Sequence, residues 1–352
     1  MTAAVVHSSS SRQGRHIPVV VGICLASLLA IALVVGISVG IGDMPIPLST
    51  TYYAITNKLG LTTIELTRIH ETVIWEYRLS RALVAVFCGA GLALCGAIMQ
   101  ALLRNPLAEP YVLGISAGAS TGAVAVVILG IGAGALSLSA GAFAGAFAAF
   151  LLVALLSSGA RGGADRTILA GVAASQLFNA ATSYIVTTSG NAQQARDVMF
   201  WLLGSFGGVR WPEFGLVSIV VGFGLILCLL YARVLDAFAF GDEAAVSLGI
   251  NVGKTRIILF ALTAVMTATI VSMVGTIGFV GLVVPHAARF VVGPLHARLL
   301  PASAVTGAVF MVLADIASRT LIPQQVLPIG VVTALVGVPF FSVILYKLQR
   351  AS

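Results

Sequence analysis

Apolar segments of membrane-spanning length recur along almost the whole chain and constrain its fold more than any other feature. Charged residues make up 9% of the sequence, whereas a soluble domain carries about 25%, so the chain has too few charges to cover a water-facing surface. A helix that crosses lipid needs about 20 mostly apolar residues. The sequence therefore predicts an all-α polytopic membrane protein with about ten transmembrane helices, whose 38 glycines would let helices approach closely.

The apolar segments divide the chain into a short tail and one large membrane domain. Residues 1–16 are expected to form a disordered cytoplasmic tail, and residues 17–348 a transmembrane domain that contains a cytoplasmic loop at 235–256. The first apolar segment is too long for a signal-peptide core, so it is expected to be retained as a span. Residues 200–206 are predicted to form a short interfacial helix. The predicted spans cover residues 18–42, 79–103, 111–132, 135–156, 167–188, 212–231, 257–275, 279–292, 302–316 and 328–346.

The distribution of charge predicts the orientation of the chain. An even number of spans places both termini on one side of the membrane. With the termini inside, the basic excess of the inner segments equals the whole net charge of +7, and the outer segments balance. The sequence therefore predicts cytoplasmic termini, and the positive charge requires no nucleic acid as partner. The outer segments also hold aromatic residues that suit a membrane interface, namely Tyr52, Tyr53, Trp75, Tyr77, Trp201 and Trp211.

The predicted span 167–188 has the most unusual face, because polar residues recur on it at helical spacing. Polar side chains at the centre of a bilayer are costly unless they face protein or water. Hydrogen bonds to a neighbouring helix, worth about 1 kcal/mol each, would satisfy some of them. The polar groups outnumber the needs of one helix contact, so this face is also a candidate lining for a pathway. Its members are Ser175, Gln176, Asn179, Thr182 and Ser183.

A polar, proline-bearing break separates the second and third predicted spans. Proline cannot continue a helix in the ordinary way, because it lacks the backbone N–H that the helix needs. The break therefore predicts a structured corner at the inner membrane face. Its residues are Arg104, Asn105, Pro106, Glu109 and Pro110.

The cytoplasmic loop contains a short segment with helix start and stop signals. Asp242 can cap the first turn of a helix, and Gly249 can end it. The segment therefore predicts a short rigid helix between two spans, although a solvated turn would show the same pattern. Its residues are Gly241, Asp242, Glu243, Ala244, Ala245, Leu248 and Gly249.

Two short motifs suggest other functions. Residues 249–255 resemble a phosphate-binding loop, but three residues separate the glycines where that motif needs four, and no strand is predicted before it. Residues 114–118 match the G-x-S-x-G pattern of a serine hydrolase by letter. Ser116 would then need a base, and His286 is the one histidine predicted at membrane depth. An intramembrane serine protease therefore stays open as a rival class.

The acids and cysteines give little support to ion-coupled or metal chemistry. A secondary transporter, the second rival, would usually carry membrane-buried carboxylates for ion coupling. Among the acids, Asp315 alone approaches the predicted membrane depth. The cysteines lie inside apolar segments and lack metal-ligand spacing, so no metal site is expected at Cys24, Cys88, Cys95 or Cys228.

Three arginines lie at the predicted outer ends of spans. Arg78 and Arg81 stand at i, i+3 and would share one helix face. Arg319 follows Asp315 by one turn near the end of another span. Arginines at span ends often extend toward lipid headgroups, so position alone assigns them no function.

Together these segments resemble the FecCD family, the membrane subunits of bacterial ABC importers for iron–siderophore complexes, haem and cobalamin. The resemblance covers nearly the whole chain after the N-terminal tail. No single motif is specific, but their combination is. The motifs stand at residues 78–81, 89–93, 100, 104–110, 113–118, 169–172, 201–206, 241–249, 278–286, 315–319 and 327–337.

The resemblance implies a cobalamin-permease-like, type II ABC importer fold. It implies a homodimer or close heterodimer of permease subunits, two cytoplasmic ATP-binding subunits and an extracytoplasmic substrate-binding protein, in the bacterial cytoplasmic membrane. The chain would not be an enzyme and would bind no cofactor, because ATP and Mg would be bound by the partner ATPase. The expected cargo is an iron–siderophore complex, with haem or cobalamin as alternatives.

The resemblance also implies contacts with two partners. Arg78, Arg81 and Arg319 fall where the family docks its binding protein, and opposed charges would speed docking and fix its orientation. The short helix at 242–248 falls where the family has a coupling helix seated on the ATPase.

The same resemblance implies a pathway and a gate. The pathway-lining helices of the family correspond to the predicted spans 167–188 and 328–346, the second of which carries Thr333. The inner gate corresponds to Ala164 and Asp165, where the cobalamin permease has small hydroxyl residues. An acid there could repel an anionic ligand or pair with the neighbouring arginine.

Overall fold

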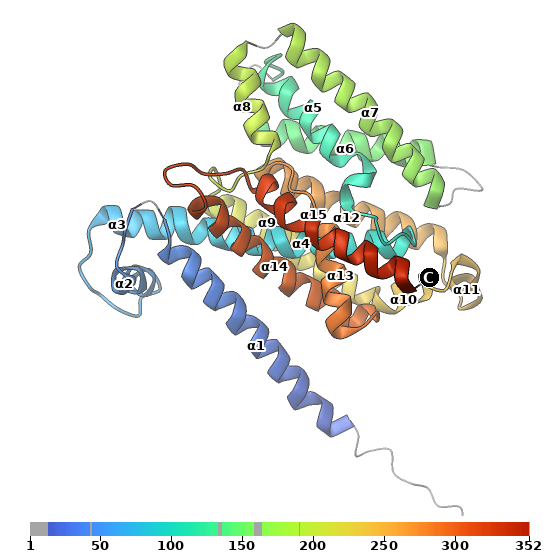
Figure 1. Cartoon of the computed structure of the whole chain (residues 1–352), viewed down its shortest axis with the longest axis horizontal. Coiled ribbons are helices and arrows are strands. Elements are labelled where there is room, and N and C mark those ends of the chain that lie inside the picture. Colours follow the sequence, from blue (N-terminus) through green and yellow to red (C-terminus); the bar gives the residue numbers. More distant parts are fainter. Residues whose placement is uncertain (1–12, 43, 133–135, 158–163, 190, 352) are drawn as a thin grey trace, which may run out of the picture.

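A computed structural model describes residues 13–42, 44–132, 136–157, 164–189 and 191–351, and these residues are mostly helical. Among them, seven helices are long and apolar enough to cross a membrane. Three shorter apolar helices accompany them, at Ile115–Val127, Val280–Val292 and Ile329–Val343. The predicted all-α, ten-span architecture is therefore confirmed (Figure 1).

The elements follow one another as α-helices, with one π-helical turn (η2) and one 3₁₀ turn (η3). In chain order the described residues form α1 (Gln13–Gly40), α2 (Leu48–Lys58), α3 (Arg68–Thr72), η2 (Val73–Leu79), α4 (Ser80–Leu102), η3 (Pro110–Leu113), α5 (Ile115–Val127), α6 (Leu138–Ser157), α7 (Ala164–Ser189), α8 (Ala192–Leu202), α9 (Trp211–Leu230), α10 (Ala232–Phe238), α11 (Asp242–Ser247), α12 (Val252–Val274), α13 (Val280–Val292), α14 (His296–Thr320) and α15 (Ile329–Ala351).

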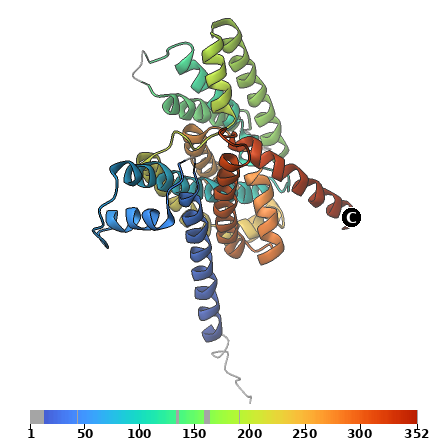
Figure 2. The ribbon, with the colours of Figure 1, turned by 60° about the vertical axis from the view of Figure 1, so that its left-hand side comes forward.

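The helices gather into two groups. The larger is built around α4, which packs against α9, α12, α13 and α14. The smaller contains α5, α6 and α7, which pack on one another, with α8 beside them. Figures 1 and 2 both show this smaller group on one side of the bundle and α1 projecting from the other.

Small residues allow α4 to form the centre of the bundle. A Cβ atom at Gly96 would lie 1.8 Å from the carbonyl oxygen of Gly281, so the backbones of α4 and α13 are in direct contact. Such close approach is how membrane helices associate, because lipid supplies no hydrophobic drive between them. As a result, 83% of the membrane-spanning window that contains α4 is buried.

Two helices start inside the bundle rather than at its surface. The segment before α13 is irregular, and Tyr111 closes it by donating a hydrogen bond to the carbonyl oxygen of Ile277 and accepting one from its N–H, both at 3.1 Å. At the start of α15, the N–H groups of Ile329 and Gly330 donate to the carbonyl oxygens of Gly204 and Leu203, each at 3.0 Å. Irregular backbone is tolerated at membrane depth when protein satisfies it in this way.

Several predicted boundaries are wrong. The short helix expected at residues 200–206 lies earlier, at Ala192–Leu202, because Asn191 and Gln194 form a capping box at its start and Gly204, with φ of 78°, follows its end. The polar sequence between the first two spans folds into α2 and α3, and an additional helix, α10, reaches into the loop that was predicted to be cytoplasmic. Polar end residues also extend α14 beyond the predicted 302–316. The first helix begins at Gln13, inside the predicted tail, whose first twelve residues lie outside the described part.

Candidate functional site

A line of polar side chains on α7 faces away from the rest of the chain. Gln176, Asn179, Ser183 and Thr187 are all exposed, and their spacing of i, i+3, i+7 and i+11 places them on one helix face. Only 17% of the membrane-spanning window of α7 is buried. Amide and hydroxyl groups are poorly suited to lipid, so this polar line must face water or another protein surface.

The remaining predicted pathway residues of α7 have a different environment. Thr121 of α5 donates to the carbonyl oxygen of Phe178 at 2.8 Å, and its hydroxyl lies 2.8 Å from that of Thr182. Ser175 is half-buried. Interhelical hydrogen bonding, the alternative considered from the sequence, therefore accounts for Thr182, while a pathway role stays a prediction for the exposed Gln176, Asn179 and Ser183.

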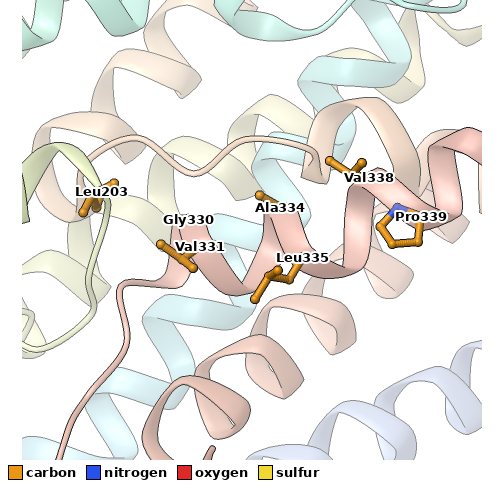
Figure 3. Close-up of a pocket in the computed structure, with 7 residues that line it drawn as sticks. All are labelled: Leu203, Gly330, Val331, Ala334, Leu335, Val338 and Pro339. Atoms are coloured by element: carbon orange, nitrogen blue, oxygen red, sulfur yellow. The ribbon is translucent and has the colours of Figure 1, made fainter. Parts of the chain in front are cut away.

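An apolar groove runs along α15. It has a volume of about 550 Å³, and Figure 3 shows its lining residues along one side of the helix and, at Leu203, on the segment that follows α8. Thr333 is not among them: it is fully buried, and its hydroxyl donates to the carbonyl oxygen of Gly330 at 3.2 Å. The lining consists of Leu203, Gly330, Val331, Ala334, Leu335, Val338 and Pro339.

The predicted inner gate lies at the first turn of α7. Ala164 packs against the hydrophobic core, whereas Asp165 is exposed. The guanidinium of Arg166 donates to the carbonyl oxygen of Leu156 at 3.1 Å, across the turn from α6. The turn itself, at 158–163, lies outside the described residues, so the gate stays a prediction.

The segment that was predicted to be cytoplasmic forms the short helix α11, but Asp242 does not cap it. Gly241, with φ of 105°, holds the N-cap position, and the Asp242 carboxylate instead pairs with the Arg256 guanidinium of α12 at 3.0 and 3.1 Å. Gly249, with φ of 80°, follows the helix end as predicted. Apolar side chains remain exposed around α11 at Phe240, Val246 and Leu248, and such a patch is typical of a protein interface.

Three arginines and one aspartate form a cluster where the C-terminal ends of α1 and α14 meet the N-terminal end of α4. Asp315 is fully buried and pairs with Arg81 at 2.7 Å and Arg319 at 3.1 Å. Arg319 also donates to the carbonyl oxygen of Ile41 at 2.6 Å and to the hydroxyl of Ser38 at 2.9 Å. A buried carboxylate requires such pairing, because an isolated charge in a low-dielectric interior is strongly unfavourable.

Arg78 has its own partners in the same cluster. It is 7% exposed and donates to the carbonyl oxygens of Val39 and Gly40 at the C-terminal end of α1, where a cation suits the helix dipole, and to that of Met44 in the loop beyond. Arg78 lies in the π-helical turn η2 and Arg81 in the first turn of α4, and a shared face for the two arginines stays a prediction. Docking of a binding protein by these arginines stays a prediction. The sequence analysis missed the partners of these arginines within the chain, although Asp315, one turn before Arg319, indicated an ion pair.

The predicted inner corner is held by side chains of α4 and α13. His286 Nε2 lies 2.8 Å from the carbonyl oxygen of Pro106, and Arg289 donates to Gln100 at 3.2 Å. The Asn105 side chain accepts from the N–H of Leu107 at 2.9 Å.

Other corner residues complete the turn. Arg104 has a positive φ of 47°, and Pro110 begins η3 after Glu109. Burial raises the pKa of the Glu109 carboxyl above its ordinary value. The contacts of His286 are those of a structural residue. The serine-protease alternative, which needs His286 as the base for Ser116, therefore gains no support.

The chain is similar to characterised transport proteins over nearly its whole length. It is 38% identical to the cobalamin import system permease protein BtuC of Halobacterium salinarum, covering 92% of this chain and 88% of the relative. It is also 38% identical to the Fe(3+) dicitrate transport system permease protein FecD of Escherichia coli, covering 80% and 87%. A solved chain described as an inward-facing, candidate metal-chelate type ABC transporter matches with a TM-score of 0.80 and 29% identity, over 93% of this chain and 99% of that one. The FecCD transport family matches residues 19–347, and this chain belongs to it.

Proposed function

We propose that this chain is the transmembrane translocation subunit of an ATP-driven importer that carries a whole metal chelate, an iron–siderophore complex first among the candidates. The observation that supports the proposal most is the polar line of α7. Gln176, Asn179 and Ser183 stand exposed at membrane depth on a chain that belongs to a family of permeases. A water-filled pathway beside α7 gives these groups a suitable environment.

The proposed importer needs partners on both sides of the membrane. In this proposal α11 and its exposed apolar neighbours dock on two cytoplasmic ATP-binding subunits, which hold the ATP and Mg. A substrate-binding protein docks on the outer side near Arg78, Arg81 and Arg319. A second permease subunit, identical or paralogous, covers the exposed faces of α7 and α15 and completes the pathway. The chain lies in the bacterial cytoplasmic membrane with both termini in the cytoplasm.

The contacts of α11 suggest how ATP hydrolysis reaches the membrane. The ion pair between Asp242 and Arg256 joins α11 to α12 directly. A hydrogen bond at 2.6 Å, between the Asp236 carboxylate of α10 and Nδ1 of His296 in α14, holds the helix that precedes α11. Movement of α11 would therefore shift α12 and α14 first, and the pathway helices α7 and α15 would follow through alternating access.

Two alternatives differ in what they require of the residues. Import of haem or cobalamin by the same mechanism would keep every role described above and change only the cargo. A secondary transporter would need an accessible carboxylate at membrane depth for ion coupling. Asp315 is the acid nearest to that depth, and its engagement by Arg81 and Arg319 supports the ATP-driven alternative.

Transport of radiolabelled cargo tests the proposal. Iron in siderophore and haem form, and cobalamin, would be supplied to cells that lack this chain and to the same cells complemented with it. We expect loss and rescue of uptake for one cargo, and collapse of the rescued uptake when cellular ATP is depleted. Rescue that survives ATP depletion and follows an ion gradient would contradict the proposal.

A further inference from the structure

A second groove lies where the two groups of helices meet, apart from the proposed pathway helices α7 and α15. It has a volume of about 570 Å³, and its lining residues come from α6, α9 and α12. Because α12 packs on both α6 and α9, it closes the groove between them (Figure 1). The groove therefore has one wall in the smaller group of helices and two in the larger.

The groove runs along the helices rather than across them. On both α9 and α12 the lining residues recur every four residues, so each helix gives the groove one face. They are Pro212, Leu216 and Val220 on α9, and Val265, Thr269 and Met273 on α12. Eight residues of helix extend about 12 Å, and half of the hydrocarbon core of a bilayer is about 15 Å thick. The groove thus has nearly the length of the hydrocarbon region of one leaflet.

Polar lining groups gather at one end of the groove. Ser139 and Glu213 lie in the first turns of α6 and α9, and the Glu213 carboxylate accepts a hydrogen bond from the N–H of Arg210 at 2.8 Å. Deeper in the groove, Ser272 of α12 is 5% exposed and donates to the carbonyl oxygen of Thr269 at 2.9 Å. Its hydroxyl is satisfied within its own helix and needs no polar ligand. A ligand with a polar end and a long apolar part matches this arrangement.

The groove opens toward the apolar surface of α9. Leu216, which is 52% exposed, stands three residues before Ile219, and the exposed apolar line of α9 continues from there through Phe223 to Leu230. Lipid tails are as apolar as these side chains, so they cover such a surface without cost. The faces of α7 and α15 proposed for the second permease subunit contribute none of the lining residues. The groove is therefore continuous with a surface that faces lipid.

An acyl chain inside the groove would be held more firmly than one on the open face of α9. Individual van der Waals contacts are weak, and their sum grows with the number of neighbouring atoms. A chain in the groove has protein on three sides, whereas a chain beside Ile219 has protein on one. Water is a poor alternative occupant, because it needs several polar partners and the lining is mostly aliphatic and aromatic.

We propose that this groove is a lipid-binding site, in which one acyl chain of a phospholipid lies between α6, α9 and α12 and joins the smaller group of helices to the larger one. In the proposed orientation of the chain this lipid belongs to the outer leaflet. The inference requires only that the chain lies in a membrane, so it does not depend on the cargo.

Tryptophan fluorescence distinguishes a bound lipid from lipid that exchanges freely. Phe143→Trp places a tryptophan in the groove, and Ile219→Trp places one on the open face of α9 as the matched control. Each variant would be reconstituted in vesicles of phosphatidylcholine with brominated acyl chains, which quench tryptophan on contact, and then extracted into detergent without bromine. The emission of the unsubstituted protein, treated in the same way, is subtracted.

We expect both tryptophans to be quenched in the vesicles and only the one at position 143 to stay quenched in detergent. Recovery of both to the same extent would overturn the proposal, because the groove would then hold only exchanging lipid. Absence of quenching at position 143 in the vesicles would overturn it as well, because protein would then fill the groove.

Filling the groove tests the site from its two walls. Val220→Phe extends a side chain into it from α9 and Ala140→Leu from α6, while Ile219→Phe enlarges a side chain outside it. Native mass spectrometry of the detergent-extracted protein measures the phospholipid that each variant retains. We expect each filled variant to bind lipid about tenfold more weakly, because loss of about ten van der Waals contacts changes the affinity by that factor. Ile219→Phe should retain lipid as the unsubstituted protein does. Undiminished retention by both filled variants would overturn the site.

Discussion

Two helices of this protein are almost equally exposed, and yet α7 carries a polar line on its exposed surface where α9 carries an apolar one. In α7 and α9, respectively 17% and 22% of the membrane-spanning window is buried. The exposed line of α7 is polar at Gln176, Asn179, Ser183 and Thr187. The exposed line of α9 is apolar and between 59% and 72% exposed, at Ile219, Phe223, Ile226 and Leu230. The exposed fraction alone does not say what covers a membrane helix, but the chemistry of the exposed side chains does. The exposed line of α9 suits lipid, and that of α7 suits water or a second subunit.

The two helices also have different supports. α9 packs on α4 and α12 in the larger group of helices, whereas α7 packs on α5, α6 and η3 in the smaller group. Figure 2 shows the smaller group at one end of the bundle, where α5 and α6 pack on α12 of the larger group. Because α7 is supported by the smaller group, it is better placed than α9 to move relative to α4 at the centre of the bundle. Alternating access requires such movement.

The largest expected difference concerns a charge placed on each helix. Ile219→Asp puts a carboxylate on the lipid-facing line of α9, near its centre, where insertion of an acid costs about 2.5–3.5 kcal/mol. Asn179→Asp puts the same group on α7, where we expect a change in stability within about 0.5 kcal/mol. The amount of membrane-inserted protein and its thermal unfolding in nanodiscs measure both. Similar losses from the two substitutions would show that α7 also faces lipid.

A smaller difference is expected from the backbone contacts that support the helices. A Cβ atom at Gly171 of α7 would lie 1.7 Å from the carbonyl oxygen of Val112, so Gly171→Ala should destabilise by about 1–3 kcal/mol. The control is Gly222→Ala on α9, where no atom lies within 4 Å and the change should stabilise by about 0.5–1 kcal/mol. Thermal unfolding in detergent compares them. Tolerance of Gly171→Ala would mean that α7 is not seated on η3 as described.

The smallest expected effect comes from the hydrogen bonds between α5 and α7. Thr121→Val keeps the shape of the side chain and removes its bonds to Phe178 and Thr182, which should cost about 0.6–1.7 kcal/mol. Ser218→Ala on α9 is the matched control, because its hydroxyl bonds within its own helix, to Gly215 at 3.0 Å. Thermal unfolding should separate the two variants. An equal effect would assign no interhelical role to Thr121.

Local features of the sequence predicted the parts of the fold that depend on local composition. An apolar segment of helix length predicts a span because lipid selects for composition over about 20 residues. The stop signal at Gly249 was also local, and its positive φ confirms it. The corner at Arg104–Pro110 was predicted from its prolines for the same reason.

Contacts between distant residues could not be predicted in this way. Asp315 pairs with Arg81 across 234 positions, and Thr182 meets Thr121 across 61, so neither spacing carries a signal. The predicted cap at Asp242 was wrong because its carboxylate forms an ion pair with Arg256 of another helix. The partners of Arg78 and Arg81, the carbonyl oxygen of Val39 and the carboxylate of Asp315, are likewise distant in the sequence.

Thiol labelling tests the central claim, that the polar line of α7 faces a water-filled pathway while α9 faces lipid. In a Cys24→Ser background, which removes the exposed native cysteine and leaves the buried Cys88, Cys95 and Cys228, single cysteines would replace Asn179 and Ile219. A membrane-impermeant thiol reagent, applied to both faces of permeabilised vesicles, reacts with a thiolate and therefore needs water at the site. The account predicts labelling of Asn179→Cys and none of Ile219→Cys. Protection of Asn179→Cys, or labelling of both at the same rate, would contradict it.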